Sequence, residues 1–248
     1  MKKYIILATL ACVSTLAYAD LLIDGGSSST FDVDAQKTFD LTDSVSGLAP
    51  TVASGETLSI QFKVTVNSTT NSLAPDWSNN NYNNMRIGFG NTTTTQAVGV
   101  AVKLYNGAAK VRNGEDTDSS SAGTFGLSSG ASTTGTGFEV GANGRLNDIG
   151  DVAYFTYTIE NTGLALNTTM VMSDAETGGT ATTVAYTTTG ITAGSWDAVD
   201  WMGFRPDNNL AANTPNITVE VIPEPATLGL IAMFGVGLIG VRRLFMIG

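Results

Sequence analysis

Carboxylates are the side chains of this sequence with the clearest catalytic potential. Among its 248 residues there is no histidine, and the single cysteine is Cys12. Neither a Ser-His-Asp triad nor a zinc site of histidines and cysteines can be built from such a chain. Two carboxylates about 5 Å or about 6.5–9.5 Å apart could hydrolyse a glycosidic bond. A Glu-x-Asp-x-x-Glu string, which would place alternate carboxylates on one face of a strand, does not occur. We therefore predict a protein that is not an enzyme and keep a glycan-active enzyme as the third hypothesis.

Two carboxylates in the middle of the chain are candidate calcium ligands. Asp116 and Asp118 are two residues apart, and Ser120 follows at the same spacing. An EF-hand loop that began at Asp116 would need glycine at its sixth position, where Ser121 stands. A looser calcium site stays open, but a solvated acidic loop accounts for these residues more simply. We expect no cofactor, with Ca²⁺ as the alternative.

Aromatic side chains in polar loops could stack on sugars. Trp77 and Tyr82 lie in a stretch rich in Asn and Ser, residues 67–84. Loop aromatics among such side chains suit carbohydrate hydroxyls. Trp201 stands in an alternating apolar run and is predicted to be a core residue, so we take Trp77 and Tyr82 as the candidate carbohydrate contacts.

Strands are the elements that must position all these residues. In residues 57–66, apolar side chains alternate strictly with polar ones, which is the period of a half-buried strand. No segment between the two ends of the chain has the period of an amphipathic helix. Further strands are expected at 21–24, 29–33, 37–41, 85–90, 97–105, 109–112, 137–141, 151–160, 164–174, 181–189, 198–206 and 216–222.

This series of short strands with Gly, Asn, Ser and Thr connections predicts an all-β fold, an antiparallel β-sandwich. A jelly roll that closes two sheets of five to seven strands is the specific expectation. Residues 113–137 depart from the pattern because they are rich in Ser, Gly and Thr and close to low complexity. We expect this stretch to be disordered.

The charge of the chain is one-sided. All 22 acidic residues lie between Asp20 and Glu224, and eight of the 12 basic residues lie there too, so this segment has a net charge of −14. An acidic surface repels nucleic acid, and we expect no nucleic-acid partner.

The first nineteen residues have the pattern of an export signal. Lys2 and Lys3 precede an apolar run, and Ala17 and Ala19 form a small-x-small cleavage site. The run is shorter than the ~20 residues that a membrane-spanning helix needs. We expect the secretion machinery to cleave after Ala19.

The C-terminal stretch has three parts in a fixed order. Pro223-Glu224-Pro225 comes first, then the uncharged residues 226–241, then Arg242 and Arg243. As a helix the uncharged run would rise about 24 Å, which with arginines free to snorkel predicts a single short transmembrane helix. The arginine pair should stay cytoplasmic and leave the rest of the chain on the far side.

This order closely resembles the PEP-CTERM sorting signal of Gram-negative bacteria that make exopolysaccharide. The resemblance covers residues 221–243 and implies recognition by an exosortase, a membrane protease, with cleavage near Pro223-Glu224-Pro225. The protein would then pass from an inner-membrane-anchored precursor to the cell surface or extracellular matrix. The residues LFMIG after the arginines depart from members that end in more basic residues.

The later half of the passenger loosely resembles a concanavalin A-like or laminin-G-like sandwich, and that resemblance implies a fold only. The expected domains are a signal peptide at 1–19, a β-sandwich at 20–222 and a sorting signal with its helix at 223–248. We predict a non-enzymatic exported protein of the surface or matrix. The alternative is a carbohydrate-binding module, assisted by Ca²⁺ or not, with extracellular polysaccharide as its partner.

Overall fold

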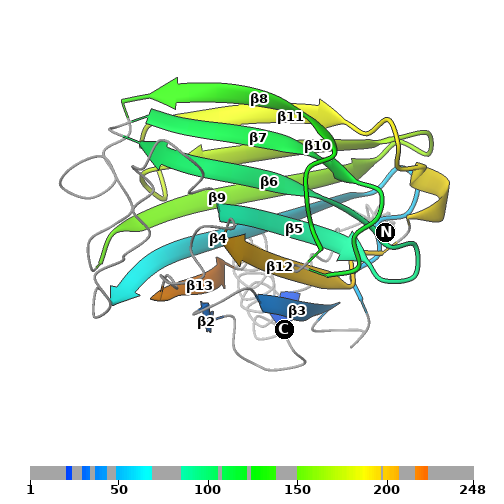
Figure 1. Cartoon of the computed structure of the whole chain (residues 1–248), viewed down its shortest axis with the longest axis horizontal. Helices are drawn as coiled ribbons and strands as arrows, with labels where there is room; N and C mark the ends of the chain where they lie inside the picture. Colours follow the sequence, from blue (N-terminus) through cyan, green and yellow to red (C-terminus); the bar gives the residue numbers. More distant parts are fainter. Residues whose placement is uncertain are drawn as a thin grey trace, which may run out of the picture. The chain divides into compact units, whose positions relative to one another are not determined.

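The computed structural model describes residues 21–23, 30–33, 37–43, 49–68, 85–105, 108–121, 124–137, 150–196, 198–206 and 216–222. These residues all belong to one compact unit, Asp20–Pro223. Within them the chain forms strands and one short 3₁₀ turn, η1 (Ala193–Ser195). Figure 1 shows the strands as two layers.

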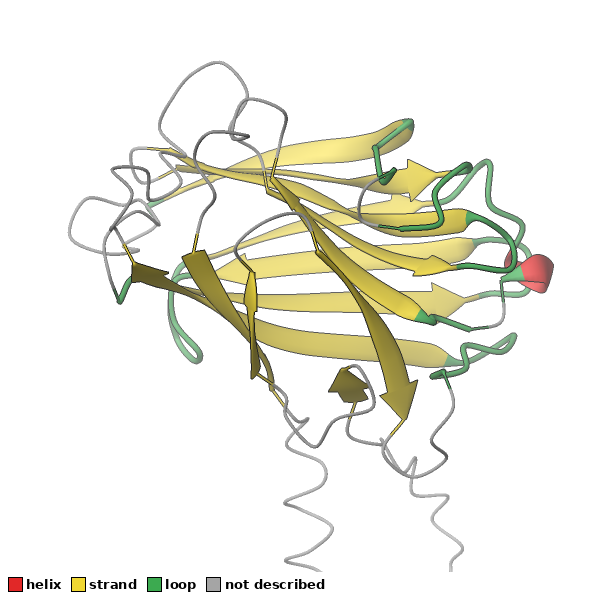
Figure 2. Ribbon diagram, turned by 60° about the horizontal axis from the view of Figure 1, so that its bottom comes forward, coloured by secondary structure: helices red, strands yellow, loops and turns green. Residues whose placement is uncertain are grey.

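The layers are two antiparallel sheets. The seven-stranded sheet has the order β1 (Leu21–Ile23), β3 (Lys37–Asp43), β12 (Trp201–Pro206), β5 (Met85–Asn91), β6 (Gln96–Tyr105), β7 (Ala108–Asp116) and β8 (Ser129–Thr136). The six-stranded sheet has the order β11 (Ala181–Thr187), β10 (Leu166–Ser173), β9 (Val152–Asn161), β4 (Thr57–Ser68), β13 (Asn216–Ile222) and β2 (Thr30–Val33). Figure 2 shows the two layers from another side.

Alternation along each strand decides which side chains reach the core. In β4, Ile60, Phe62 and Val64 are buried, and the residues between them are partly exposed. The partner strand β9 buries Phe155 and Tyr157 in the same way. Burial of each such side chain stabilises the fold by about 1.5–3 kcal/mol. The strict period of residues 57–66 therefore gives both the strand and its buried face.

Aromatic rings join the two sheets across the core. Phe62 of β4 lies 6.4 Å from Phe89 of β5 and 6.2 Å from Phe204 of β12, measured between ring centroids. Phe89 stacks on Tyr157 of β9, with a centroid distance of 4.6 Å. Because each contact pairs one strand of each sheet, the aromatic residues fix how the layers face one another.

A buried amide also bridges the sheets. Asn113 of β7 donates through Nδ2 to the carbonyls of Thr168 and Val184, at 3.1 and 3.2 Å. Its Oδ1 accepts a hydrogen bond of 3.1 Å from the Tyr157 hydroxyl. Burial raises the pKa of Tyr157, which keeps this hydroxyl protonated as a donor. All donors and acceptors of the Asn113 side chain thus have partners, as a buried amide requires.

The expected all-β fold of two antiparallel sheets, with five to seven strands each, is confirmed. The predicted signal peptide and the C-terminal helix lie outside the described residues, and so do residues 138–141 of the expected strand 137–141. Among the described residues, no helix has the length and apolar character to span a bilayer.

The expectation of disorder in residues 113–137 is wrong. β7 continues to Asp116, and β8 occupies Ser129–Thr136 although it consists only of Ser, Gly, Ala and Thr. Between them Phe125 is 1% exposed. Composition misled the prediction because small residues can form a strand where a neighbouring strand supplies the hydrogen bonds, as β7 does for β8 along eight residue pairs.

Candidate functional site

A row of glycines crosses the outer face of the seven-stranded sheet, the face turned away from the core. Strand register pairs Gly203 with Gly88, Gly88 with Gly99, Gly99 with Gly114 and Gly114 with Gly130. We call these five residues the glycine row; they come from β12, β5, β6, β7 and β8 in order. With no side chains across five neighbouring strands, the row makes a bare strip of backbone on the sheet.

The described parts of the loop between β7 and β8, residues 117–121 and 124–128, lie over this strip (Figure 1). Phe125 from the loop lies on the row. A Cβ built on Gly88 would lie 2.9 Å from Cγ and Cδ1 of its ring, and a Cβ on Gly99 would lie 2.8 Å from its Cζ. Both positions therefore need glycine for the loop to approach.

An indole lies beside Phe125 on the same face. A Cβ on Gly90 would collide with the ring of Trp201, and the rings of Trp201 and Phe125 meet edge to face with their centroids 6.5 Å apart. Together with Ala97 and the partly buried Leu127 they form a small apolar cluster separate from the main core. Trp201 is 1% exposed, and its Nε1 finds no acceptor among the described residues. The prediction that Trp201 is buried holds, but it is buried under a loop rather than between the sheets.

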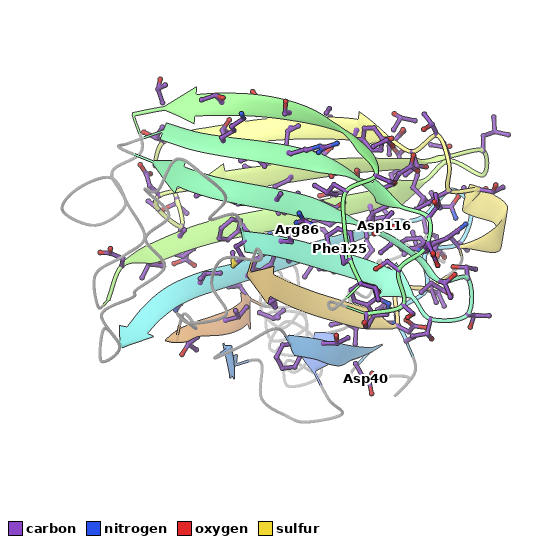
Figure 3. The ribbon with its side chains drawn as sticks, viewed as in Figure 1. Asp40, Arg86, Asp116 and Phe125 are labelled. Carbon is purple, nitrogen blue, oxygen red and sulfur yellow. The ribbon has the colours of Figure 1, made fainter. Side chains whose placement is uncertain are left out.

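Hydrogen bonds pin the loop to the strand from which it leaves. Asp116 accepts a bond of 2.6 Å from the Gly126 amide at Oδ2 and one of 3.1 Å from the Asp118 amide at Oδ1. The Arg86 guanidinium donates to the Phe125 carbonyl at 3.5 Å. Figure 3 shows Arg86, Asp116 and Phe125 where the loop crosses the sheet, and Asp40 farther away on β3.

These contacts give Asp116, one of the two candidate calcium ligands, another role. Asp116 binds backbone amides of its own loop, and Asp118 is exposed. In the part of the chain that the structure describes, no three His, Cys, Asp or Glu side chains are grouped so that they could hold a metal ion. Calcium binding stays a prediction from the sequence.

Glu115 has a role that the sequence analysis missed. We expected a solvated acidic loop, but Glu115 is 2% exposed. Its carboxylate accepts hydrogen bonds from the amides of Thr189, Gly190 and Ile191, at 2.9–3.2 Å, and from the hydroxyls of Ser129 and Tyr186 at 2.9 Å. Burial alone would raise the pKa of Glu115, but these donors outweigh it and lower the pKa to about 2. Glu115 thus fastens the loop after β11 to β7 and β8.

The rows on either side of the glycine row differ in charge. On one side the register runs Asp40, Trp201, Gly90, Ala97, Asp116. On the other it runs Arg205, Arg86, Ala101, Arg112, Ser132, and beyond that Lys103, Lys110, Thr134. We call these last two lines the basic rows. The outer face therefore has an acidic, aromatic end and a basic end, with the glycine row between them. Of that row Gly130 is exposed, and the other four glycines are buried.

Three further described carboxylates accept hydrogen bonds from backbone amides. Asp200 accepts bonds from the Thr92 amide and hydroxyl, and Asp174 from the Thr180 amide. Glu56 accepts a bond from the Ala53 amide. Carboxylates bound to turn amides in this way act as turn and loop caps. The candidate contacts Trp77 and Tyr82, the cleavage-site residues Ala17 and Ala19, and the sorting residues Pro223, Glu224, Pro225, Arg242 and Arg243 lie outside the described residues.

The protein belongs, by its observed architecture, to the class of two-layer antiparallel β-sandwiches. No protein-family model matches the chain, and no curated protein matches it in sequence. Among solved structures it is similar to arcelin-5, a lectin-like defense protein from Phaseolus vulgaris, with 9% identity over 83% of this chain and 96% of that one and a TM-score of 0.39. It is also similar to a seed lectin isoform of Lotus tetragonolobus, with 8% identity over 84% and 95% of the two chains and a TM-score of 0.35. Both TM-scores are below 0.5, so the likeness carries no conclusion about function.

Proposed function

We propose that this chain is an exported, non-enzymatic β-sandwich protein that an exosortase sorts to the cell surface or extracellular matrix. The observation that carries the proposal is the order of parts at the two ends. A signal sequence opens the chain, and Pro223-Glu224-Pro225, an apolar run and the pair Arg242-Arg243 close it. The first part directs export, and the last three give a membrane-anchored intermediate with its cleavage motif outside.

The described part of the chain supports a passenger without catalysis. Residues Asp20–Pro223 form one compact unit, and its sequence contains neither histidine nor cysteine. Glu115 and Asp116 face away from one another, since neighbouring residues on a strand point to opposite faces of the sheet. Each is saturated by hydrogen bonds from loop amides, which suits a structural carboxylate better than a proton-transfer group.

The sorting proposal is tested in cells that produce the protein. Replacing Glu224 with Gln, or both Arg242 and Arg243 with Ala, should leave uncleaved protein in the membrane fraction. Glu220→Gln is the matched control, because Glu220 lies in β13 outside the motif and forms a surface ion pair with Lys63. Release of the Glu224 and arginine variants at the rate of the Glu220 control would contradict exosortase sorting.

A second candidate function is carbohydrate binding. The observation that favours it is the outer face of the seven-stranded sheet, where the exposed residues Ser132, Thr134 and Gly130 lie beside the exposed Lys110 and Arg112. Hydroxyl, cationic and backbone groups of this kind can form hydrogen bonds to sugar hydroxyls. A glycan array probed with the full chain in detergent, with and without Ca²⁺, tests this function. Absence of binding in both conditions would remove it.

A further inference from the structure

Most of the basic residues of the passenger lie together. Eight lysines and arginines fall between Asp20 and Glu224, against 22 acidic residues. Five of these eight occupy the basic rows, where register brings them together from four strands: Arg86, Lys103, Lys110, Arg112 and Arg205. A chain with a net charge of −14 in this segment thus places most of its basic residues at one end of one sheet face.

Two side chains of the basic rows are open to a partner. Lys110 and Arg112 are exposed, and within the described ranges neither side chain has a hydrogen bond or an ion pair. On the six-stranded sheet, by contrast, Lys63 pairs with Glu220 at 2.5 Å. Lys110 and Arg112 stand two residues apart on one strand, about 6.7 Å. Arg86 and Arg112 are separated by one strand, which places their backbones about 10 Å apart.

The surroundings of the basic rows add hydrogen-bonding groups and free space. Ser132 and Thr134 continue the rows onto β8, and both are exposed. Gly130, at the β8 end of the glycine row, is exposed as well. Cationic side chains therefore border hydroxyls and uncovered backbone on a flat strand surface.

We infer that the exposed Lys110 and Arg112 of the basic rows, with Ser132, Thr134 and Gly130, bind an anionic polysaccharide, one whose sugars have carboxylate or sulfate groups. The inference rests on the second candidate function and specifies its ligand class and its site. Charge complementarity selects an anion, and spaced cations suit a polymer with charges at intervals along it. The hydroxyls and the exposed backbone at Gly130 suit the uncharged parts of the sugar rings.

The overall charge of the protein favours this occupant over the denser polyanions. Double-stranded DNA has one charge per about 1.7 Å, and a long duplex would extend past the basic rows toward acidic surface. A polysaccharide with widely spaced charges is repelled less by this acidic surface, because repulsion beyond about 8 Å is screened at physiological salt. An exported protein would also meet such polymers in an extracellular matrix.

The test compares variants of the full chain in detergent by their affinity for polygalacturonate, with neutral dextran, duplex DNA and phosphatidylglycerol vesicles as the other probes. Arg112→Gln and Lys110→Gln should each weaken polygalacturonate binding about two- to fivefold at low salt, and the pair about tenfold. Arg112→Lys should retain binding. Lys63→Gln changes the net charge by the same amount on the other sheet and should leave affinity unchanged.

Each outcome has one meaning. The inference is supported if Lys110→Gln and Arg112→Gln weaken polygalacturonate binding and if added salt weakens it too. Binding to neutral glycans alone would overturn it and leave the second candidate function standing. Absence of binding to any glycan would remove both. Equal losses in Lys63→Gln and Arg112→Gln, or tighter binding to DNA or vesicles than to polygalacturonate, would also overturn the inference.

Discussion

The ring of Phe125 rests on the backbone of Gly88, so closely that a Cβ at Gly88 would lie 2.9 Å from two of its ring carbons. The three nearest atoms to that Cβ all belong to Phe125. The two residues come from the β7–β8 loop and from β5, 37 positions apart in the chain. The contact therefore holds the loop against the outer face of the sheet. It also means that the loss of folding stability caused by a side chain at position 88 depends on the ring of Phe125.

The first prediction is a double-mutant cycle on this contact. Gly88→Ala should lower the free energy of unfolding by about 2 kcal/mol, because it overpacks the loop against the sheet. Phe125→Ala should lower it by about 3 kcal/mol. In the Phe125→Ala background, Gly88→Ala should cost nothing, because the colliding ring is gone. Urea denaturation of the four proteins measures the coupling.

Gly194→Ala is the control for the cycle. A Cβ at Gly194 would meet no atom within 4 Å, so this substitution should be close to neutral. A loss at Gly88→Ala that persists in the Phe125→Ala background would show that Phe125 does not lie on the strip.

The second prediction concerns Glu115 and pH. Its pKa is lowered to about 2 in the folded protein, below the ~4.3 of an unfolded glutamate, so the ionised carboxylate stabilises the fold. This stability is fully present above about pH 4.5 and is lost as pH falls toward 2. Glu115→Gln should cost about 3 kcal/mol at pH 7, because an amide cannot accept all the loop hydrogen bonds. The difference between wild type and variant should shrink steadily below pH 4.5.

Glu160→Gln is the matched control for Glu115. Glu160 is exposed and accepts one side-chain hydrogen bond, from Asn167. Its replacement should change stability by less than about 1 kcal/mol at any pH. Thermal melts from pH 7 to pH 2 compare the three proteins. A Glu115→Gln difference that is constant with pH would mean that the carboxylate is not ionised in the loop.

The third prediction compares two buried indoles. Trp196 donates from Nε1 to the Gln96 carbonyl at 3.3 Å, while Nε1 of Trp201 has no acceptor among the described residues. Both residues are 1% exposed or less, so replacement by Phe removes similar volume from each site. Trp196→Phe should therefore cost about 1 kcal/mol more than Trp201→Phe, because only the former loses a hydrogen bond. Equal denaturation midpoints would show that Nε1 of Trp201 is also bonded.

Local pattern was enough to predict β4 and β9 with their buried faces, although it missed β8. The alternation around Phe62 gave β4, and the same period around Phe155 gave β9, because a half-buried strand imposes a period of two. The ordered conformation of the β7–β8 loop could not be predicted in this way. It depends on glycines from other strands, Gly88 and Gly99, that only strand register brings under Phe125.

The candidate site also depends on register. Glu115 binds amides 74–76 residues away, and its neighbours in the sequence suggest only an acidic loop. Arg86 and Arg112 lie in one row because each pairs with Ala101, which no local pattern reveals. The proposed sorting residues are the opposite case, since their order along the chain is itself the signal.

Our central proposal is that the two ends of the chain direct its sorting. The intact mass of the protein recovered from the surface of producing cells tests this proposal most directly. The expected polypeptide begins at Asp20 and ends near Pro223-Glu224-Pro225, without residues 226–248. A surface protein whose mass includes residues 226–248 would contradict the claim.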